Sequence, residues 1–447
     1  MLDLGLRELD RIKRDVFKTT LQAEMTDMQW ALAKQPSSGI GLALGDPDNV
    51  AIACHLASLG DTSRTLKRLA ESLSRETNLP KIQMLDGIRA ALGRESGLEE
   101  LLSEMQRLVD TVEVHEKITN LPGTDQLDIM PSSRRMRRYF EAQKRRQILD
   151  SRTWTRAQLA RLRSGGEEGA GAWTDTLPVI GPTKADPQTF SHMLYTRLQI
   201  DWPEARKVGT CECGRLQNAP MRSGAHFMFQ CSRFSRFDAH RAVVRTMENM
   251  YRQLGVQYAT EPCGLQQGSE RRPADVMVVV PSEAHPEAMR AVAWDVGVTD
   301  PGGDQHLLMG SDKVPLNAAA NMTATKLKRF EERLETNPPT LQFDYKPVVY
   351  ESTSARGASA KEWWDGICQM AKDKESTMGL GFGSLMEYNG LAYAWSGQTF
   401  KRHWGNRMSF SIMYRAHLAG VKRVHEISQT QGAARASHMA GGPNNLG

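Results

Sequence analysis

Four side chains that can bind a metal fall within a short stretch near the middle of the chain. They are Cys211, Cys213, His226 and Cys231, in the spacing C-x-C-x12-H-x4-C. Zinc takes thiolate and imidazole ligands in a tetrahedron, and this set can supply four. Three of the chain's six cysteines lie here, which favours a structural zinc site over scattered buried thiols. His240 could compete for the fourth position, but we expect it to be an ordinary helix residue.

A pair of acidic residues follows the cysteine cluster. Asp275 directly precedes a predicted strand at 276–280, and Asp295 lies within a second predicted strand at 291–298. On the face of the second strand that carries Asp295 the neighbouring residues are small, so a metal and a phosphate could approach it. Paired carboxylates suit a catalytic magnesium or manganese ion, and such an ion promotes phosphodiester hydrolysis.

Other residues could complete such a site. Glu261 follows a predicted long helix and could add a carboxylate, although a surface glutamate is the more common case. Lys326 and Lys328 flank Leu327 on a predicted helix, and either could lean toward the sheet edge to offset developing negative charge. Solvated lysine is an equally good interpretation of each one.

The elements that must position these residues follow from periodicity. Helices are predicted at 4–32, 50–59, 62–74, 82–92, 98–118, 190–198, 234–254, 316–334, 362–372 and 406–421, with a third strand at 346–351. The expected fold class is α+β, with a helical N-terminal region, a zinc knuckle and a small mixed sheet flanked by helices. The predicted domains are a helical region (1–163), a Gly/Pro-rich linker with a short helix (164–205), the knuckle and its helix (206–260), the core with the acidic pair (261–360), and C-terminal helices with a loose tail (361–447).

Charge and composition add weaker indications. The net charge is +5 and the hydrophobic fraction is 40%. No apolar run is long enough to cross a bilayer and the first residues lack a signal pattern, so we expect an intracellular protein, nuclear or cytoplasmic, that does not bind a membrane. A basic run predicts either phosphate contacts or a solvated helix face, and it comprises Arg134, Arg135, Arg137, Arg138, Lys144, Arg145 and Arg146.

A series of short motifs occurs in a fixed order: Cys211-Glu-Cys213-Gly, Gly224-Ala-His226, Cys231, Arg236-x-x-x-His240, Arg272-Pro-Ala-Asp275 and Asp295-Val-x-Val-Thr299. In combination they resemble the C-terminal region of non-LTR (LINE-type) retrotransposon reverse transcriptase polyproteins. That region joins a linker, a CCHC zinc knuckle and a restriction-like endonuclease of the PD-(D/E)XK type. The segments before the knuckle show a weaker similarity, and the resemblance covers roughly residues 30 to 425.

The resemblance implies a nuclease that nicks target DNA, with zinc on the Cys/His set and magnesium or manganese on Asp275 and Asp295. The usual D/E-x-K lysine would stand at position 297, where this sequence has glycine. Lys326 matches a helix lysine of the family, four residues before an aromatic, and Glu351 falls in the family's third-strand segment. Because no paired-aspartate polymerase motif is found, we expect no reverse transcription by this chain alone. DNA, element RNA and a reverse transcriptase acting in trans are the expected partners.

Three functions remain open from the sequence. The first is a metal-dependent DNA endonuclease. The second is a zinc-stabilised nucleic-acid-binding module whose nuclease core has decayed, which the missing lysine at position 297 favours. The third is a folded remnant without activity.

Overall fold

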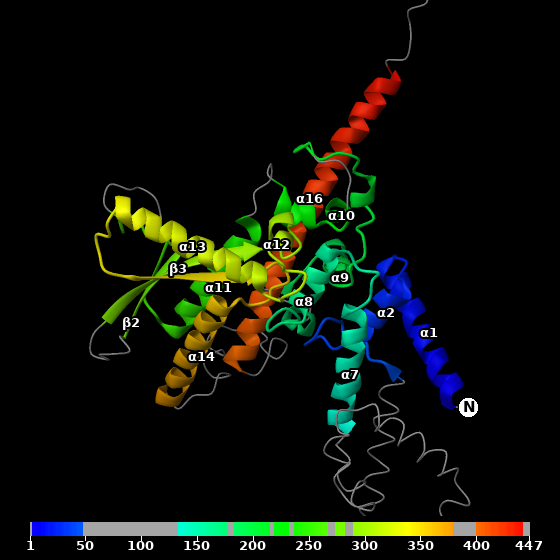
Figure 1. The fold of residues 1–447 in the computed structure, drawn as a ribbon, viewed down its shortest axis with the longest axis horizontal. Helices are drawn as coiled ribbons and strands as arrows, with labels where there is room; N and C mark the ends of the chain where they lie inside the picture. The colour runs from blue at the N-terminus through cyan, green and yellow to red at the C-terminus, as the bar shows by residue number, and fades with distance from the viewer. Residues whose placement is uncertain are drawn as a thin grey trace, which may run out of the picture. The chain divides into compact units, whose positions relative to one another are not determined.

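A four-stranded mixed sheet is flanked by helices (Figure 1). Its strands are β1 (Tyr258–Thr260), β2 (Val276–Pro281), β3 (Met289–Thr299) and β4 (Asp344–Glu351), in the order β1-β2-β3-β4. Strand β2 runs antiparallel to its neighbours β1 and β3, whereas β4 is parallel to β3. A parallel pair needs a long crossover, and helix α13 (Asn317–Thr336) lies within it. With the surrounding helices, this sheet confirms the α+β class.

The computed structural model describes residues 2–47, 133–176, 183–214, 219–231, 237–266, 273–281, 289–378 and 399–440. The chain forms two compact units, one of residues 1–17 and 45–146 and the other of residues 18–44 and 147–447. All of the residues discussed below as sites belong to the second unit, apart from the basic run. The helices predicted between 50 and 118, Arg272 and the predicted tail lie outside the described residues.

Among the described residues, helices α11 (Phe237–Leu254), α13 and α14 (Ala358–Met378) pack against the sheet. Helix α13 packs on the face that carries Asp295 and Gly297. Helices α11 and α14 contact each other through a 2.7 Å hydrogen bond from Trp363 Nε1 to the Tyr251 hydroxyl. Residues alternate across a strand, so successive side chains of β4 meet different helices. The sheet is therefore covered by helices that can bring side chains to both of its faces.

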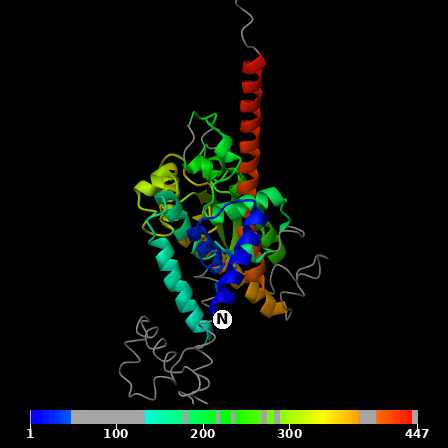
Figure 2. The same cartoon turned by 90° about the vertical axis from the view of Figure 1, so that its right-hand side faces the viewer.

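The long helix α16 (Phe400–Ala440) packs against α9, α11 and the turns η2 and η5, and it extends past them (Figure 2). Its buried residues Phe410 and Met413 join Trp173 and Met193 in one core cluster. The remaining elements are α8 (Arg156–Gly165), η2 (Ala172–Asp175), α9 (Pro187–Arg197), η4 (Ala205–Lys207), α10 (Ala219–Arg222), η5 (His226–Gln230) and α12 (Asp304–Leu308). In the described part of the chain, no helix combines the length and apolar character needed to span a bilayer.

The N-terminal helix is interrupted where the sequence predicted one continuous helix over 4–32. Helix α1 (Leu2–Leu21) ends first, and α2 (Asp27–Lys34) begins after a short break. Thr26 accepts a hydrogen bond from the Gln29 amide, and the Gln29 side chain accepts one from the Thr26 amide. This reciprocal capping box starts a new helix despite the apolar periodicity.

The glycine-rich stretch after residue 164, predicted to be a linker, is packed into the second unit. Ser164, Ala170 and Trp173 are buried. A Cβ at Gly171 would lie 1.6 Å from the Ser37 carbonyl oxygen, so glycine permits a close backbone approach here. The glycines of this segment serve tight packing.

Candidate metal cluster and acidic site

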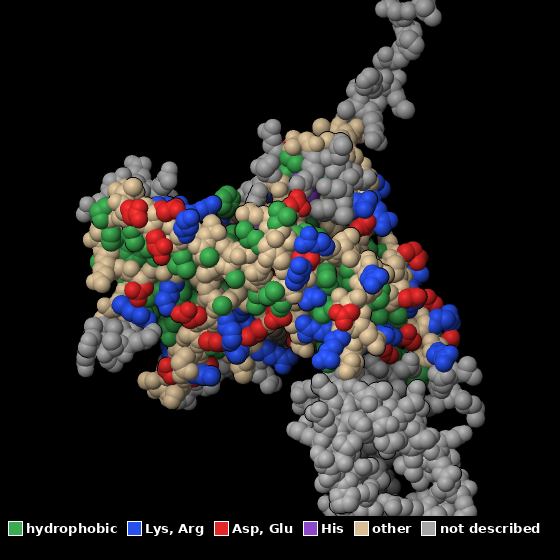
Figure 3. Space-filling view, viewed as in Figure 1, with side chains coloured by type: hydrophobic (Ala, Val, Ile, Leu, Met, Phe, Trp, Pro, Cys, Tyr) green, Lys and Arg blue, Asp and Glu red, His purple; other side chains and the backbone are tan. Residues whose placement is uncertain are grey.

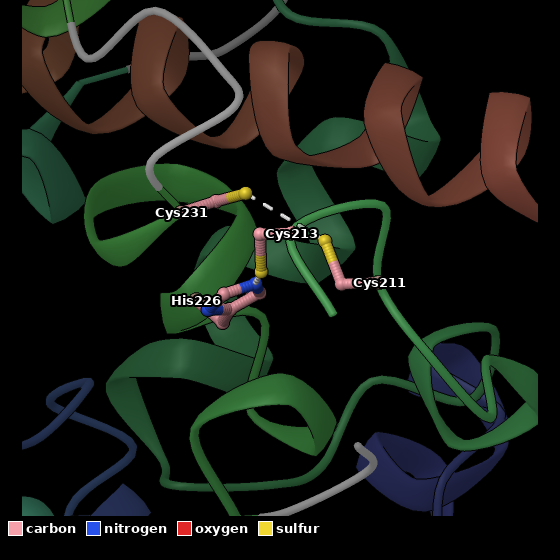
Figure 4. A group of neighbouring side chains, drawn as sticks. All are labelled: Cys211, Cys213, His226 and Cys231. Atoms are coloured by element: carbon pink, nitrogen blue, oxygen red, sulfur yellow. Dashed lines mark hydrogen bonds between the residues drawn. The ribbon is translucent and has the colours of Figure 1, made fainter. Parts of the chain in front are cut away.

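The four predicted metal ligands lie together (Figure 4). Their ligand atoms are all within 4.8 Å of one another. Cys211 Sγ lies 3.6 Å from Cys231 Sγ, and Cys213 Sγ lies 3.4 Å from His226 Nε2. Metal bonds of about 2.0–2.3 Å in a tetrahedron give edges of about 3.3–3.8 Å. The cluster could therefore hold a metal ion such as zinc.

Local turns hold these ligands in place. The amide of Gly214, which has φ of +81°, donates to the Cys211 carbonyl at 2.8 Å and closes the first turn. His226 begins the π-helical turn η5, and the Cys231 amide donates back to the His226 carbonyl at 2.8 Å. Gly224 packs against the Trp202 ring, where a Cβ would come within 2.3 Å. The chain thus presents two ligands from each of two turns.

Burial shapes the chemistry of the cluster. Cys211, His226 and Cys231 are buried, and Cys213 is half-buried. Burial raises the pKa of Cys211 to about 12, and the neighbouring Cys231 adds to this rise. A thiolate in this position needs a cation beside it, and a metal ion deprotonates the thiols that it binds.

The acidic site lies where β2 begins beside β3. Asp275 directly precedes β2, and its Oδ2 accepts hydrogen bonds from the Val296 amide at 2.7 Å and from His240 Nε2 at 3.0 Å. Burial opposes ionisation of Asp275, but His240, the Val296 amide and Lys326 outweigh it, so its pKa lies below the ordinary value. Asp275 is thereby held as a fixed carboxylate.

Asp295 is held by two other groups. Lys326 Nζ on α13 lies 2.7 Å from its Oδ1, and the Tyr345 hydroxyl on β4 donates to its Oδ2. The Tyr345 ring stacks on Phe330 of α13, with centroids 3.9 Å apart. Burial raises the pKa of Asp295, and the charge of Asp275 adds to the rise, although Lys326 and Tyr345 offset part of it. The two carboxylates therefore influence each other's ionisation, and Lys326 offsets part of their negative charge.

Gly297 makes room for Lys326. A Cβ at position 297 would lie 2.8 Å from Met322 Sδ and 3.0 Å from Lys326 Cε. The sequence predicted that the small residues beside Asp295 leave open space for ligands. At Gly297 that space is instead filled by two side chains of α13.

The remaining predicted site residues differ in how close they lie to the acidic pair. Lys328 is exposed and lies 3.9 Å from Glu332, and Leu327 is exposed rather than buried. Glu261 is exposed just after β1, and its backbone amide donates to the Asp275 carbonyl oxygen at 2.7 Å. Glu351 is fully buried and pairs in register with Thr299, four residues along β3 from Asp295. The structure thus brings together Asp275, Asp295 and Lys326 of the predicted catalytic set.

The basic run forms helix α7 (Ser133–Leu149). Its later members Lys144 and Arg145 are half-buried, and Arg146 is exposed. Nothing is described of the side chains of Arg134, Arg135, Arg137 and Arg138. The basic run therefore lies on a helix, and its contact with phosphate stays a prediction.

Two site residues were not predicted. His240 was expected to be an ordinary helix residue; it lies on α11 as expected and outside the metal cluster, but it also contacts Asp275. Tyr345 reaches Asp295 from β4. For His240 the available signal was its place near the start of an amphipathic helix that precedes the sheet. The pairing of Tyr345 depends on strand register, which the sequence does not specify.

The Asp300 carboxylate, at the end of β3, contacts both helix α8 and the residue next to Cys231 of the metal cluster. Arg161 on α8 binds Asp300 at 2.8 and 3.0 Å, and both side chains are about 95% buried or more. Gln230, next to Cys231, donates to Asp300 Oδ2 at 2.8 Å. Asp300 directly follows β3, so the cluster and the strand that carries Asp295 are linked through one carboxylate.

Comparison of the sequence with known protein families and with curated proteins found no match to either a family model or a curated protein.

Proposed function

We propose that this protein is a metal-dependent DNA endonuclease that nicks one strand and is derived from a non-LTR retrotransposon. The observation that carries the proposal is the 2.7 Å contact between Lys326 Nζ and Asp295 Oδ1 beside Asp275. A lysine supplied from α13 takes the place of the lysine missing at position 297. Two carboxylates, a lysine and a histidine meet where β2 begins beside β3. They come from the residue before β2, from β3, from α13 and from α11.

A magnesium or manganese ion fits the chemistry of these donors. Magnesium prefers oxygen ligands and is often held by one or two carboxylates plus waters and substrate phosphate. Both hydrogen bonds that Asp275 receives from described residues end on Oδ2, which leaves Oδ1 as the ligand atom. The raised pKa of Asp295 reflects burial and repulsion from Asp275, which a divalent cation would relieve. Asp275 and Asp295 would hold the ion.

The bound ion would neutralise the phosphate and lower the pKa of a bound water. Lys326 contributes a positive charge beside the acidic pair, where it can stabilise negative charge that develops on the phosphate. His240 holds the Asp275 carboxylate in one orientation through its 3.0 Å contact. The Tyr345 hydroxyl, on the neighbouring strand β4, holds the Asp295 carboxylate in the same way. These contacts pre-organise the carboxylates before DNA arrives.

Zinc on Cys211, Cys213, His226 and Cys231 is proposed to be structural. All four ligands come from the protein, so the metal would have no open position for substrate. The ion would fix the two turns that also carry Gln230 toward Asp300. Removal of the zinc ion should therefore lower the stability of the fold, and it should change the cleavage rate only through that loss.

A second candidate function is nucleic-acid binding without cleavage. Its support is that both oxygens of Asp295 are already engaged, by Lys326 and Tyr345. Figure 3 shows Lys and Arg interspersed with Asp and Glu on the face in view, rather than gathered in one patch, so this face adds no support for the binding function. DNA, element RNA and a reverse transcriptase acting in trans remain proposed partners, and the proposed location is the nucleus or cytoplasm.

Plasmid nicking tests the first function. Wild-type protein should nick supercoiled plasmid with magnesium and lose this activity with EDTA. Asp275→Asn and Asp295→Asn should abolish nicking, and Lys326→Ala should slow it about 100-fold, in line with the loss of one electrostatic contact in a transition state. Lys328→Ala is the matched control, because this exposed lysine lies two residues away on the same helix.

Two outcomes would contradict the endonuclease. One is equal nicking by wild type and the Asp275→Asn variant, which would point to a contaminating nuclease. The other is tight, salt-sensitive DNA binding with no metal-dependent cleavage, which would favour the binding module.

A further inference from the structure

The start of helix α13 lacks a cap of its own. Its N-cap residue, Leu316, has φ of +62° and makes no side-chain hydrogen bond to the helix. The first amides of a helix have no partner within the helix, so a buried start needs acceptors from elsewhere. Ala318 and Ala319, in the first turn, are fully buried.

Glu351 supplies an acceptor from β4. Its Oε1 accepts a hydrogen bond from the Ala319 amide at 3.2 Å, at the third helical position where a capping side chain usually binds. A carboxylate is also favourable near the positive end of the helix dipole. Glu351 is fully buried, and burial raises its pKa to about 7, opposed by Ser164 and the Ala319 amide.

The capped residue lies on the same stripe as the lysine. Ala319 precedes Lys326 by seven residues, which is nearly two turns or about 10.5 Å along the axis. Between them Met322 contacts the Gly297 position, and one turn beyond Lys326 the Phe330 ring stacks on Tyr345. This stripe runs over β3 and β4, so an axial shift or rotation of α13 would move Lys326 away from Asp295.

We propose that Glu351 is a positioning residue that fixes the register of α13 on the sheet and thereby holds the Lys326 amine at Asp295. The catalytic consequence rests on the proposed endonuclease. Glu351 does not touch the acidic pair, because β4 pairs it with Thr299 whereas Asp295 pairs with Pro347. On this proposal its effect on cleavage passes through Lys326, which the double variant below tests.

The test compares nicking by Glu351→Ala, Lys326→Ala and the double variant. Glu351→Ala should slow nicking at least 10-fold, and it should add nothing in the Lys326→Ala background. Glu351→Gln keeps an oxygen acceptor of the same reach and should restore most of the rate, whereas Glu351→Asp is one methylene shorter and should not.

If Glu351→Ala fails to fold, the nicking rates of Glu351→Gln and Glu351→Asp decide between positioning and a merely structural role. Additive losses, or equal rates for Gln and Asp, would overturn the proposal.

A control separates positioning from general destabilisation. Met193 is buried in a cluster with Trp173, Phe410 and Met413, away from α13, so Met193→Ala lowers stability without touching this helix. Hydrogen exchange should quicken at amides 319–326 in Glu351→Ala but not in Met193→Ala. This measurement needs no cleavage, so if wild type does not nick DNA, the proposed function fails while exchange still tests the register. Equal exchange at these amides in both variants would refute positioning by Glu351.

Discussion

Gly297→Ala introduces one methyl group at the point where β3 meets α13. The new carbon would lie 2.8 Å from Met322 Sδ and 3.0 Å from Lys326 Cε. Ordinary contacts between such atoms are about 3.5–4.0 Å, so one or both side chains must move. Lys326 is the one whose movement matters, because its amine lies 2.7 Å from Asp295 Oδ1.

The cost follows from this geometry. Overpacking by one methyl typically costs about 1–3 kcal/mol. The lower end applies if the flexible Met322 side chain absorbs the clash, and the upper end applies if Lys326 leaves a largely buried carboxylate uncompensated. In the second case the free energy of unfolding should fall by about 2–3 kcal/mol, and nicking should slow about 10- to 100-fold as the lysine charge is withdrawn.

Thermal unfolding and plasmid nicking together check this prediction. Gly366→Ala is the matched control: it makes the same substitution at an exposed position of α14, where nothing lies within 4 Å of the new carbon, and it should stabilise by about 0.5–1 kcal/mol. Adding Met322→Ala to Gly297→Ala frees space and should recover part of both losses. A Gly297→Ala protein with wild-type stability and activity would refute the idea that Lys326 depends on the glycine.

Three further predictions address the rest of the second unit. Cys231→Ser should lose the bound metal by elemental analysis and lower the melting temperature, whereas exposed Cys263→Ser should do neither. Arg161→Met should lower the free energy of unfolding, measured in urea, by about 3–5 kcal/mol, because the buried Asp300 carboxylate then has no positive partner. The pKa of Glu351 rises on folding from 4.5 to about 7, so the folded state binds the proton more tightly and this group reduces stability as pH rises between those values. Glu351→Gln should therefore show a flatter melting temperature between pH 5 and 8 than the wild type; an unchanged slope would contradict the assignment.

The strands and helices of the sheet region could be predicted because their signals are local. Alternation of apolar residues gave β2, β3 and β4 to within a few residues, and helical periodicity gave α13. The short β1 was missed, because its three residues carry too little pattern. The break before α2 was also missed, although Thr26 and Gln29 hold a capping-box spacing that could have revealed it.

The site was only partly predictable, for a physical reason. The four metal ligands are close in sequence, so their spacing was sufficient. The partners of Asp295 come from α13 and β4, and choosing Lys326 over Lys328 required knowing which side of the helix meets the sheet. Tyr345 depends on strand register and His240 on helix packing, and both are set by contacts distant in sequence.

Helix α16 braces the loops of the metal cluster from far along the chain. Arg423 donates to the Phe227 carbonyl, 196 positions earlier, and Gln431 donates to the Thr210 carbonyl at 2.7 Å. The cluster is therefore not a self-sufficient finger that only its ion can fold. A peptide of about residues 206–231 should bind metal more weakly than the whole chain. In the whole chain α16 already orders the two loops, whereas the peptide loses this conformational entropy when it binds the metal.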